Sequence, residues 1–214
     1  MSTSYERTRK RFAGERAAQR YDDRLLGSAK DRRERRAIAA LLGALPSGAR
    51  VLDLPCGTGR LTGWLAEQGW RVVAADASAA MVVRAQTRLA GTDGVAFSVH
   101  DALRTGFRSG SFDAVVCNRL LHHLIEPEAR TALVAELLRV SAGPLVVSYF
   151  DRRSLHARWV ALRDRLRGKR RRDRLAIPRA RLRREIEAAG GRLVAIVPTR
   201  RWVSQQHYAR IERR

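Results

Sequence analysis

A glycine-containing turn between an apolar run and a helical pattern constrains this chain more than any other feature. The segment Val51-Leu52-Asp53-Leu54-Pro55-Cys56-Gly57-Thr58-Gly59 places an acid at the end of a strand-like run, followed by two glycines. Glycine lets the backbone turn tightly and lie close to a ligand because it has no Cβ. A second apolar run, residues 72–75, ends in Asp76, whose carboxylate can accept hydrogen bonds from ribose hydroxyls. The pattern therefore indicates a nucleotide-cofactor site at one edge of a sheet.

The spacing and charge of this turn distinguish two classes of cofactor. A dinucleotide-binding turn reads G-x-G-x-x-G and holds a pyrophosphate at a helix N-terminus. Counted from Gly57, the third glycine position is Thr62. Asp53 would repel a pyrophosphate but suits a cationic ligand. S-adenosylmethionine (SAM) carries a sulfonium and an ammonium, so both features favour SAM over a nicotinamide dinucleotide.

These residues and two further motifs resemble the class I SAM-dependent methyltransferases, especially the group that contains the ubiquinone and menaquinone biosynthesis enzymes. The resemblance covers roughly residues 21–147 and is carried by residues 53–59, Asp76, His100-Asp101-Ala102 and the run 112–124. It is specific for cofactor and fold, and poor for substrate. Pro55 is a departure, because the family's loop usually has its first glycine there and proline fixes φ.

The resemblance implies a role for each residue of the cofactor site. The backbone at Gly57 and Gly59 would approach the methionine part of SAM, and Asp76 would bind the ribose. Asp101 would reach the adenine amino group, while the backbone of Ala102 donates to the adenine ring. Taken singly, these acids also fit helix caps or turns. The full predicted cofactor set is Tyr21, Asp53, Pro55, Gly57, Gly59, Asp76, Ala77, Asp101, Ala102 and Asn118.

Two members of this set have their own arguments. Asn118 follows an apolar run and would line the methionine end of the cofactor. Tyr21 resembles an N-terminal Tyr-Asp element that closes over SAM in related enzymes, although an ordinary aromatic residue at a helix end fits the pattern equally well.

Apolar runs that alternate with helical periodicity predict an α/β fold with a Rossmann-like, doubly wound sheet. With the family's closing strands, we expect a seven-stranded, mostly parallel sheet with an antiparallel edge strand. The 214 residues are expected to form a single methyltransferase domain, with an N-terminal helical cap at 1–46 and a basic helical insertion at 151–190. The expected strands are 51–54, 72–75, 95–99, 112–117, 145–149, 193–197 and 202–208, and the expected helices are 36–45, 58–68, 79–89 and 127–140.

The net charge of +22 is large, and 40 of the 43 basic residues are arginine, a skew that a GC-rich coding sequence can also produce. Residues 151–184 hold fifteen basic against three acidic side chains, a local charge of +12. Their apolar residues have helical spacing, so one face of a helix is expected to pack on the domain while arginines stay in water. The face consists of Leu155, Trp159, Leu162 and Leu166, and the solvated arginines are Arg158, Arg163, Arg165 and Arg167.

Such a helix can simply be soluble, or can contact an anionic membrane, a small anionic molecule, a glycan or a lipid head group. RNA is the least favoured partner. Base-N6 methyltransferases carry Asn-Pro-Pro-aromatic after the fourth strand, whereas this chain has Asn118-Arg119-Leu120-Leu121.

Candidate catalytic groups lie just beyond the fourth predicted strand. Methyl transfer from a sulfonium is a direct displacement that depends on positioning and solvent exclusion. A hydroxyl acceptor would benefit from a general base, and His122 and His123 are the candidates, although a structural hydrogen-bonding role remains open for both. No histidine combines with Cys56 or Cys117 at zinc-site spacing, so no metal is expected and both cysteines are expected to be reduced.

No run approaches the ~20 apolar residues that cross a bilayer, and residues 1–20 are too charged for a signal peptide. We therefore expect a cytoplasmic protein, with peripheral contact to the inner membrane face as an option. The sequence predicts a SAM-dependent methyltransferase for a small or amphiphilic, anionic acceptor, with O-methylation preferred. The alternatives are a non-catalytic SAM-binding interaction module and an RNA methyltransferase.

Overall fold

The computed structural model describes residues 3–12, 27–166 and 174–214. Within them, eight strands form one sheet in the order β3-β2-β1-β4-β5-β8-β7, and the short β6 pairs with β5. The strands are β1 Arg50–Asp53, β2 Arg71–Asp76, β3 Val95–Val99, β4 Ala114–Cys117, β5 Leu145–Asp151, β6 Ala176–Ile177, β7 Gly191–Pro198 and β8 Gln206–Arg213. Strand β8 runs antiparallel to both neighbours, β5 and β7, and the other pairs are parallel.

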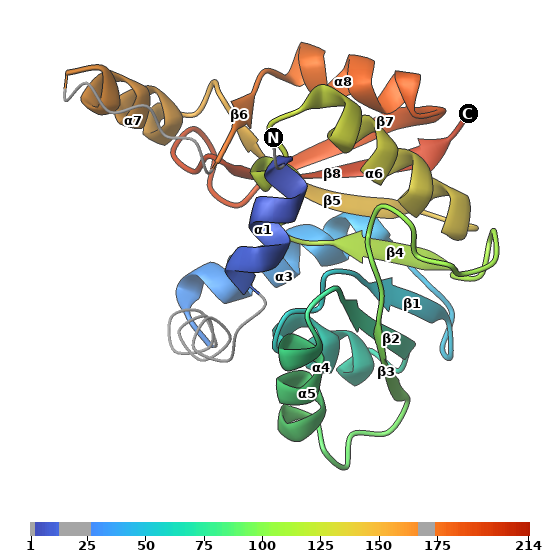
Figure 1. The fold of residues 1–214 in the computed structure, drawn as a ribbon. Helices are drawn as coiled ribbons and strands as arrows, with labels where there is room; N and C mark the ends of the chain where they lie inside the picture. The colour runs from blue at the N-terminus through green and yellow to red at the C-terminus, as the bar shows by residue number, and fades with distance from the viewer. Residues whose placement is uncertain (1–2, 13–26, 167–173) are drawn as a thin grey trace.

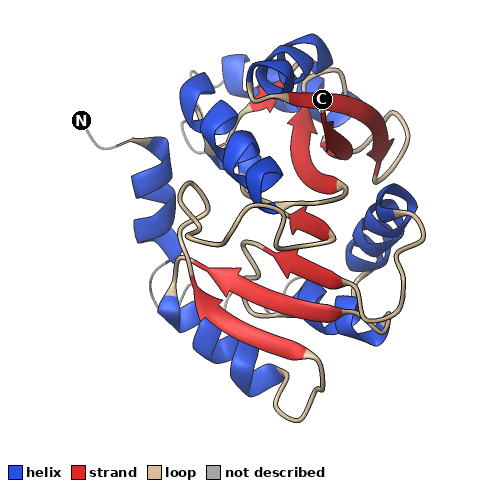
Figure 2. Ribbon diagram, turned by 90° about the vertical axis from the view of Figure 1, so that its right-hand side faces the viewer, coloured by secondary structure: helices blue, strands red, loops and turns tan. Residues whose placement is uncertain are grey.

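Helices cover both faces of this sheet (Figure 1, Figure 2). They are α1 Ser4–Phe12, α3 Ala29–Leu42, α4 Arg60–Glu67, α5 Ala79–Arg88, α6 Pro127–Val140, α7 Leu155–Leu166 and α8 Arg179–Ala188, with a 3-10 turn, η1, at Leu121–His123. Side chains of α6 and α8 pack with Leu52 and Val115 in one core, and those of α3 and α4 pack with Val51 and Val116 in another. Because neighbouring strand residues point to opposite faces, each central strand contributes to both cores.

The strand order reverses between β1 and β4, since β2 and β3 extend the sheet in one direction and β5 in the other. In open α/β sheets, ligands bind at the carboxyl ends of the strands beside such a switch point. The predicted α/β, Rossmann-like, doubly wound fold is therefore confirmed, and this edge is where the glycine turn lies.

Several element boundaries differ from those expected. Helix α3 begins seven residues before the predicted 36–45 helix, because the Ser28 hydroxyl caps it by accepting from the amide of Asp31. The predicted strand 202–208 is wrong at its start: residues 201–203 form a turn, with Trp202 at φ 65°, and the strand begins at Gln206. Strand β6 was not expected, because two residues carry no detectable periodicity.

Helix α7 corrects the prediction for the basic segment. The apolar row Leu155, Trp159, Leu162 and Leu166 was expected to pack on the domain, yet these side chains are 57–78 % exposed. The helix projects from the body of the molecule (Figure 1), and its backbone is bonded to the rest at its first turn, through Leu155 N to Trp202 O and His156 N to Val203 O. Helical spacing predicted the helix correctly, but it could not say whether a partner surface lies within reach. Among the described residues, no helix is long and apolar enough to cross a membrane.

Candidate active site

The turn after β1 supplies a backbone surface at the sheet edge. Gly57 and Gly59 have φ values of 55° and 80°, in the left-handed region that favours glycine. A Cβ on Gly59 would also lie 3.0 Å from Leu89 and 3.1 Å from Ala85 of the neighbouring α5 region. The Cys56 amide donates to Ala75 O at 2.8 Å, which ties the turn to β2. The glycines thus allow the chain to reverse into α4 while keeping close to β2.

Asp76 is held at the end of β2 by the same turn. Its carboxylate accepts from the amides of Gly57, at 3.0 Å, and Ser78, at 2.9 Å. Each carboxylate oxygen has a second lone pair, so Asp76 keeps acceptor capacity for further donors. Burial raises the pKa of this carboxyl, and the backbone hydrogen bonds oppose the rise. Asp76 and its neighbour Ala77 both line a cavity.

Asp53 lies beneath the turn and is fully buried. The Thr62 hydroxyl donates to its Oδ2 at 2.7 Å, while Oδ1 has no hydrogen-bond partner among the described residues. Burial raises the pKa of Asp53 to about 7, the hydrogen bond from Thr62 and the charge of Arg60 oppose the rise, and the nearby Asp76 adds to it. Thr62, which stands where a dinucleotide turn has glycine, therefore positions this carboxylate. A cationic ligand would satisfy the orphaned oxygen, and this fits the charge of SAM.

Asp101 and Ala102 follow β3 and lie together, as predicted, but helix α1 engages both. The Tyr5 hydroxyl donates to Asp101 Oδ1 at 2.5 Å and accepts from the amide of Ala102 at 3.1 Å. Arg9 binds the other carboxylate oxygen of Asp101 at 3.0 Å. Ala102 lines the cavity together with Tyr5 and Arg9, whereas Asp101 and Gly59 do not contribute to its wall.

Asn118 directly follows β4, the strand that pairs with β1 just before the glycine turn. Its Oδ1 accepts from the Tyr208 hydroxyl at 2.8 Å, and Gln206 donates to the same hydroxyl at 3.0 Å. Because Oδ1 is bound to β8, the amide orientation of Asn118 is set by a distant strand. Asn118 also lines the cavity.

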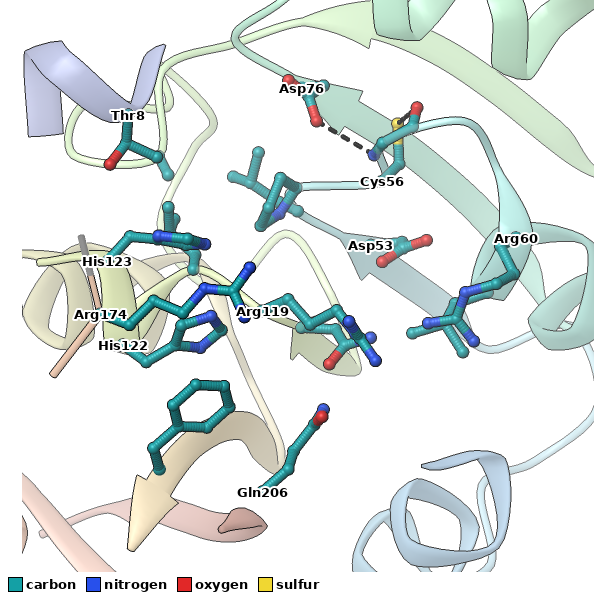
Figure 3. A pocket seen from close by; sticks show the side chains of 18 of the residues that line it. Thr8, Asp53, Cys56, Arg60, Asp76, Arg119, His122, His123, Arg174 and Gln206 are labelled. Atoms are coloured by element: carbon teal, nitrogen blue, oxygen red, sulfur yellow. Dashed lines mark hydrogen bonds between the residues drawn. The ribbon is translucent and has the colours of Figure 1, made fainter. Parts of the chain in front are cut away.

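His122 and His123 lie in η1, at the other end of the cavity. The ring of His122 stacks on Phe150, with 3.9 Å between centroids and 9° between planes, and its Nδ1 has no hydrogen-bond partner in the described part of the chain. Burial holds the pKa of His122 well below its usual value, and the charges of His123 and Arg174 add to this effect. His122 is therefore a neutral imidazole at physiological pH. Figure 3 shows Arg174 beside the two histidines, where the Leu175 amide bonds to His122 O at 2.7 Å.

An ionic network joins α3, the start of α4 and the segment that follows β4. Glu34 of α3 is buried and binds both Arg60, at 2.8 Å, and Arg119, while Arg60 also pairs with Asp31. Lys30 lies nearby, and its pKa is lowered first by burial and then by the positive charge of Arg119. None of these residues was predicted. Arg119 could have been suspected from its place directly after Asn118, but the rest depend on contacts that no local pattern encodes.

The cavity has a volume of about 990 Å³ and connects the glycine turn to the two histidines. Ligand pockets span roughly 300–1,000 Å³, so this cavity has room for a nucleoside cofactor and a small second molecule. Of the predicted site residues, it brings together Asp53, Pro55, Gly57, Asp76, Ala77, Ala102, Asn118, His122 and His123. Tyr21 lies outside the described residues. Over the described ranges, no cluster of His, Cys, Asp or Glu is arranged to hold a metal ion.

Comparisons with known proteins agree with this geometry. A protein-family model described as a methyltransferase domain matches residues 51–142. The demethylmenaquinone methyltransferase of Beutenbergia cavernae is 41% identical over 138 residues, which are 63% of this chain and 55% of that protein. The ubiquinone biosynthesis O-methyltransferase of Xanthomonas axonopodis pv. citri is 37% identical over 111 residues, 50% of this chain and 45% of that protein. The chain thus matches about half the length of these relatives.

The fold has a close counterpart among solved structures. The crystal structure of magnesium protoporphyrin IX methyltransferase from Synechocystis PCC 6803 with bound SAM has a TM-score of 0.73 at 20% identity, and the match covers 100% of this chain and 99% of that one. At this identity the likeness concerns the fold. The family match identifies residues 51–142 as a methyltransferase domain, and this range holds the glycine turn and the acids at the ends of β1 and β2, while the fold is the one seen in SAM-dependent methyltransferases.

Proposed function

We propose that this protein transfers a methyl group from SAM to a small, anionic and amphiphilic molecule, with oxygen as the preferred acceptor atom. The observation that supports this most strongly is one cavity with two ends of opposite charge. The carboxylates of Asp53 and Asp76 lie at the glycine turn, and Arg174 lies beside the histidines (Figure 3). Lys30 also lines the cavity, and its charge contributes to the lowered pKa of His122. A cationic methyl donor and an anionic methyl acceptor would therefore bind at different ends of the same cavity.

The cofactor end has the groups to hold SAM. Asp76 would accept from the ribose hydroxyls, and the buried Asp53 would favour the cationic part of the cofactor. When bound, SAM supplies a methyl group that an incoming nucleophile displaces directly. The remaining task of the protein is to orient the acceptor and exclude water, which accounts for most of the acceleration in such reactions.

The acceptor end has a hydrogen-bond acceptor, His122, and two basic side chains, Lys30 and Arg174. The neutral His122 would accept a hydrogen bond from an acceptor hydroxyl, and Arg174 and Lys30 would bind its anionic group. An anion there would also offset the positive charges that lower the pKa of His122, and so make the imidazole a better base. The names of the two relatives refer to demethylmenaquinone and to O-methylation in ubiquinone biosynthesis, and a hydroxyl on a quinone-like ring fits this arrangement.

The rim of the cavity supports an amphiphilic acceptor. His156 of α7 and Val203 line the cavity, and the exposed Trp159 and Trp202 belong to the same helix and turn. An acceptor with an apolar tail could extend from the cavity along this rim. By the same reasoning we propose a cytoplasmic protein that contacts the anionic inner face of the membrane through α7.

The proposal is tested by incubating the purified protein with methyl-labelled SAM and a small-molecule extract, and by searching for labelled products by mass spectrometry. We expect a product whose mass exceeds that of its precursor by one CH₂ group plus the extra mass of the isotope label. Asp76→Ala should abolish binding of S-adenosylhomocysteine (SAH), whereas Asp93→Ala, which removes an exposed carboxylate, should change nothing.

His122→Gln separates binding from turnover. It should keep the SAH affinity of the parent protein and reduce product formation by about 10²–10⁴-fold, the usual range for a lost proton acceptor. SAH binding without any product would favour the non-catalytic module instead, and label in the RNA fraction would favour an RNA methyltransferase. Product formed normally by Asp76→Ala would remove the ribose-binding role.

A further inference from the structure

Helix α1 places a single oxygen atom between two groups at the end of β3. The Tyr5 hydroxyl donates to the Asp101 carboxylate at 2.5 Å and accepts from the Ala102 amide at 3.1 Å. The side chain is 7% exposed and packs in the same core cluster as Leu54 and Ala75. Burial and the charge of Asp101 raise the pKa of Tyr5, so the phenol keeps its proton and acts as a donor at neutral pH.

The same two protein groups match the Watson–Crick edge of adenine. That edge presents an amino N–H donor beside a ring-nitrogen acceptor, which suit a carboxylate and a backbone amide respectively. Tyr5 satisfies both with one hydroxyl, because an O–H group can donate and accept at once. An adenine ring cannot bind this pair while Tyr5 remains there, since the Ala102 amide has one proton to donate.

Further contacts dock α1 in this position. Ser4 N donates to Glu126 Oε1 at 3.1 Å, its hydroxyl accepts from Ile125 N at 2.9 Å, and the hydroxyl also donates to Glu126. Arg9 pairs with the second oxygen of Asp101 at 3.0 Å. Helix α1 is thus bound both to the segment before α6 and to the end of β3, and its residues Tyr5 and Thr8 form part of the cavity wall, as Figure 3 shows for Thr8.

We propose that α1 is an intramolecular competitor of the cofactor: Tyr5 occupies the adenine-recognition pair Asp101–Ala102 and has to leave it when the adenosine part of SAM or SAH binds. This rests on the proposed function, in which the cavity holds SAM with its adenine at that pair. Cofactor affinity is then the intrinsic affinity of the open site reduced by the fraction of molecules in which α1 is undocked.

Calorimetry of SAH and of adenosine on the 214-residue chain tests this. Tyr5→Phe keeps the aromatic packing and removes the hydroxyl, and Ser4→Ala weakens the docking of α1 while leaving Tyr5 in place. Both should bind SAH and adenosine about five- to thirty-fold more tightly than the parent, as expected when one or two hydrogen bonds no longer compete. Lys10→Ala changes an exposed residue of the same helix and should bind like the parent.

Hydrogen exchange gives an independent readout. On adding saturating SAH, the amides of α1 should exchange faster, because the helix has lost its contact with the end of β3. Equal SAH affinity in Tyr5→Phe, Ser4→Ala and the parent, weaker binding by Tyr5→Phe, or increased protection of α1 would overturn the inference and leave the proposed function intact. If neither the parent nor Tyr5→Phe binds SAH at all, the proposed function fails as well.

Discussion

At the scale of single residues, burial in the fold changes the pKa of Asp53. A carboxylate in water ionises near pH 4, but this one is enclosed beneath the glycine turn with one oxygen unpaired, and its pKa rises to about 7. Thr62 donates to the other oxygen and keeps the group oriented. A cationic ligand bound beside Asp53 would therefore favour the ionised form of this carboxyl.

This predicts a pH dependence of cofactor binding. SAH keeps the same charges between pH 5.5 and 7.5, so a change in affinity over that range reports the protein. If the cation of SAH favours ionised Asp53, affinity should rise with pH, by about tenfold for each unit below the pKa, and level off above pH 7. Asp53→Asn should bind with little pH dependence. Calorimetry of both proteins across the range checks this, and parallel curves would exclude Asp53 as the titrating group.

The free energy of unfolding of the ligand-free protein should also depend on the ionisation of Asp53. The contribution of Asp53 to this stability should fall as pH rises, whereas the affinity for SAH rises. Because the folded pKa lies above the ordinary value of 3.8, the folded state retains the proton at a pH where the unfolded chain loses it. The contribution of Asp53 is thus fully present below pH 4 and is lost as pH rises to about 7. Denaturant unfolding of the parent and of Asp53→Asn at pH 4 and pH 7 measures this. The free energy of unfolding of Asp53→Asn, relative to that of the parent, should be higher at pH 7 than at pH 4.

At the scale of elements, α7 carries a row of apolar side chains that the rest of the described domain does not cover. Its apolar side chains are exposed, and Arg163 lies over the Trp159 ring at 5.0 Å, so cationic and apolar groups share one surface. A helix of this kind suits an anionic lipid surface, where the apolar side chains are buried and the arginines meet phosphates.

We therefore expect the protein to co-sediment with vesicles that contain phosphatidylglycerol, and less so at high salt because screening weakens the arginine contacts. Trp159→Ala with Leu162→Ala should weaken binding by at least tenfold, since burying each such side chain contributes about 1.5–3 kcal/mol. Val83→Ala, on α5 and as exposed as Trp159, is the matched control. Unchanged vesicle binding by the double variant, or equal binding to neutral vesicles, would contradict this role of α7.

At the scale of the whole molecule, a buried ion pair fastens the second half of the chain to the segment that carries the histidines. Arg130 of α6 is 1% exposed and binds both carboxylate oxygens of Glu185 in α8, at 2.8 and 2.5 Å. Its Nη1 donates to the carbonyls of Leu124 and Ile125, directly after η1. One guanidinium thus links α6, α8 and the segment that follows the two histidines of the cavity.

Removing one charge from this pair leaves the other buried without compensation. Glu185→Gln should therefore lower the free energy of unfolding by about 3–5 kcal/mol. Glu187→Gln is the control on the same helix: its pair with Arg214, at 3.4 Å, is solvent-exposed and should contribute less than about 1 kcal/mol. Urea unfolding with an unchanged m-value measures both. A Glu185→Gln effect as small as that of Glu187→Gln would mean that the pair contributes little.

The sequence alone determined the order of strand, turn and helix, the position of the glycine turn, and the placement of Asp53 and Asp76 at the same edge of the sheet. These follow from short-range rules: apolar periodicity sets the strands, glycine permits the turn, and parallel strands bring their carboxyl ends to one edge. Only the tertiary structure decided that Tyr5 binds Asp101, that Arg119 pairs with Glu34, that Asp53 titrates near pH 7 and that the apolar face of α7 has no cover. Each of these depends on burial or on a contact between residues far apart in the chain, and no local pattern carries either quantity.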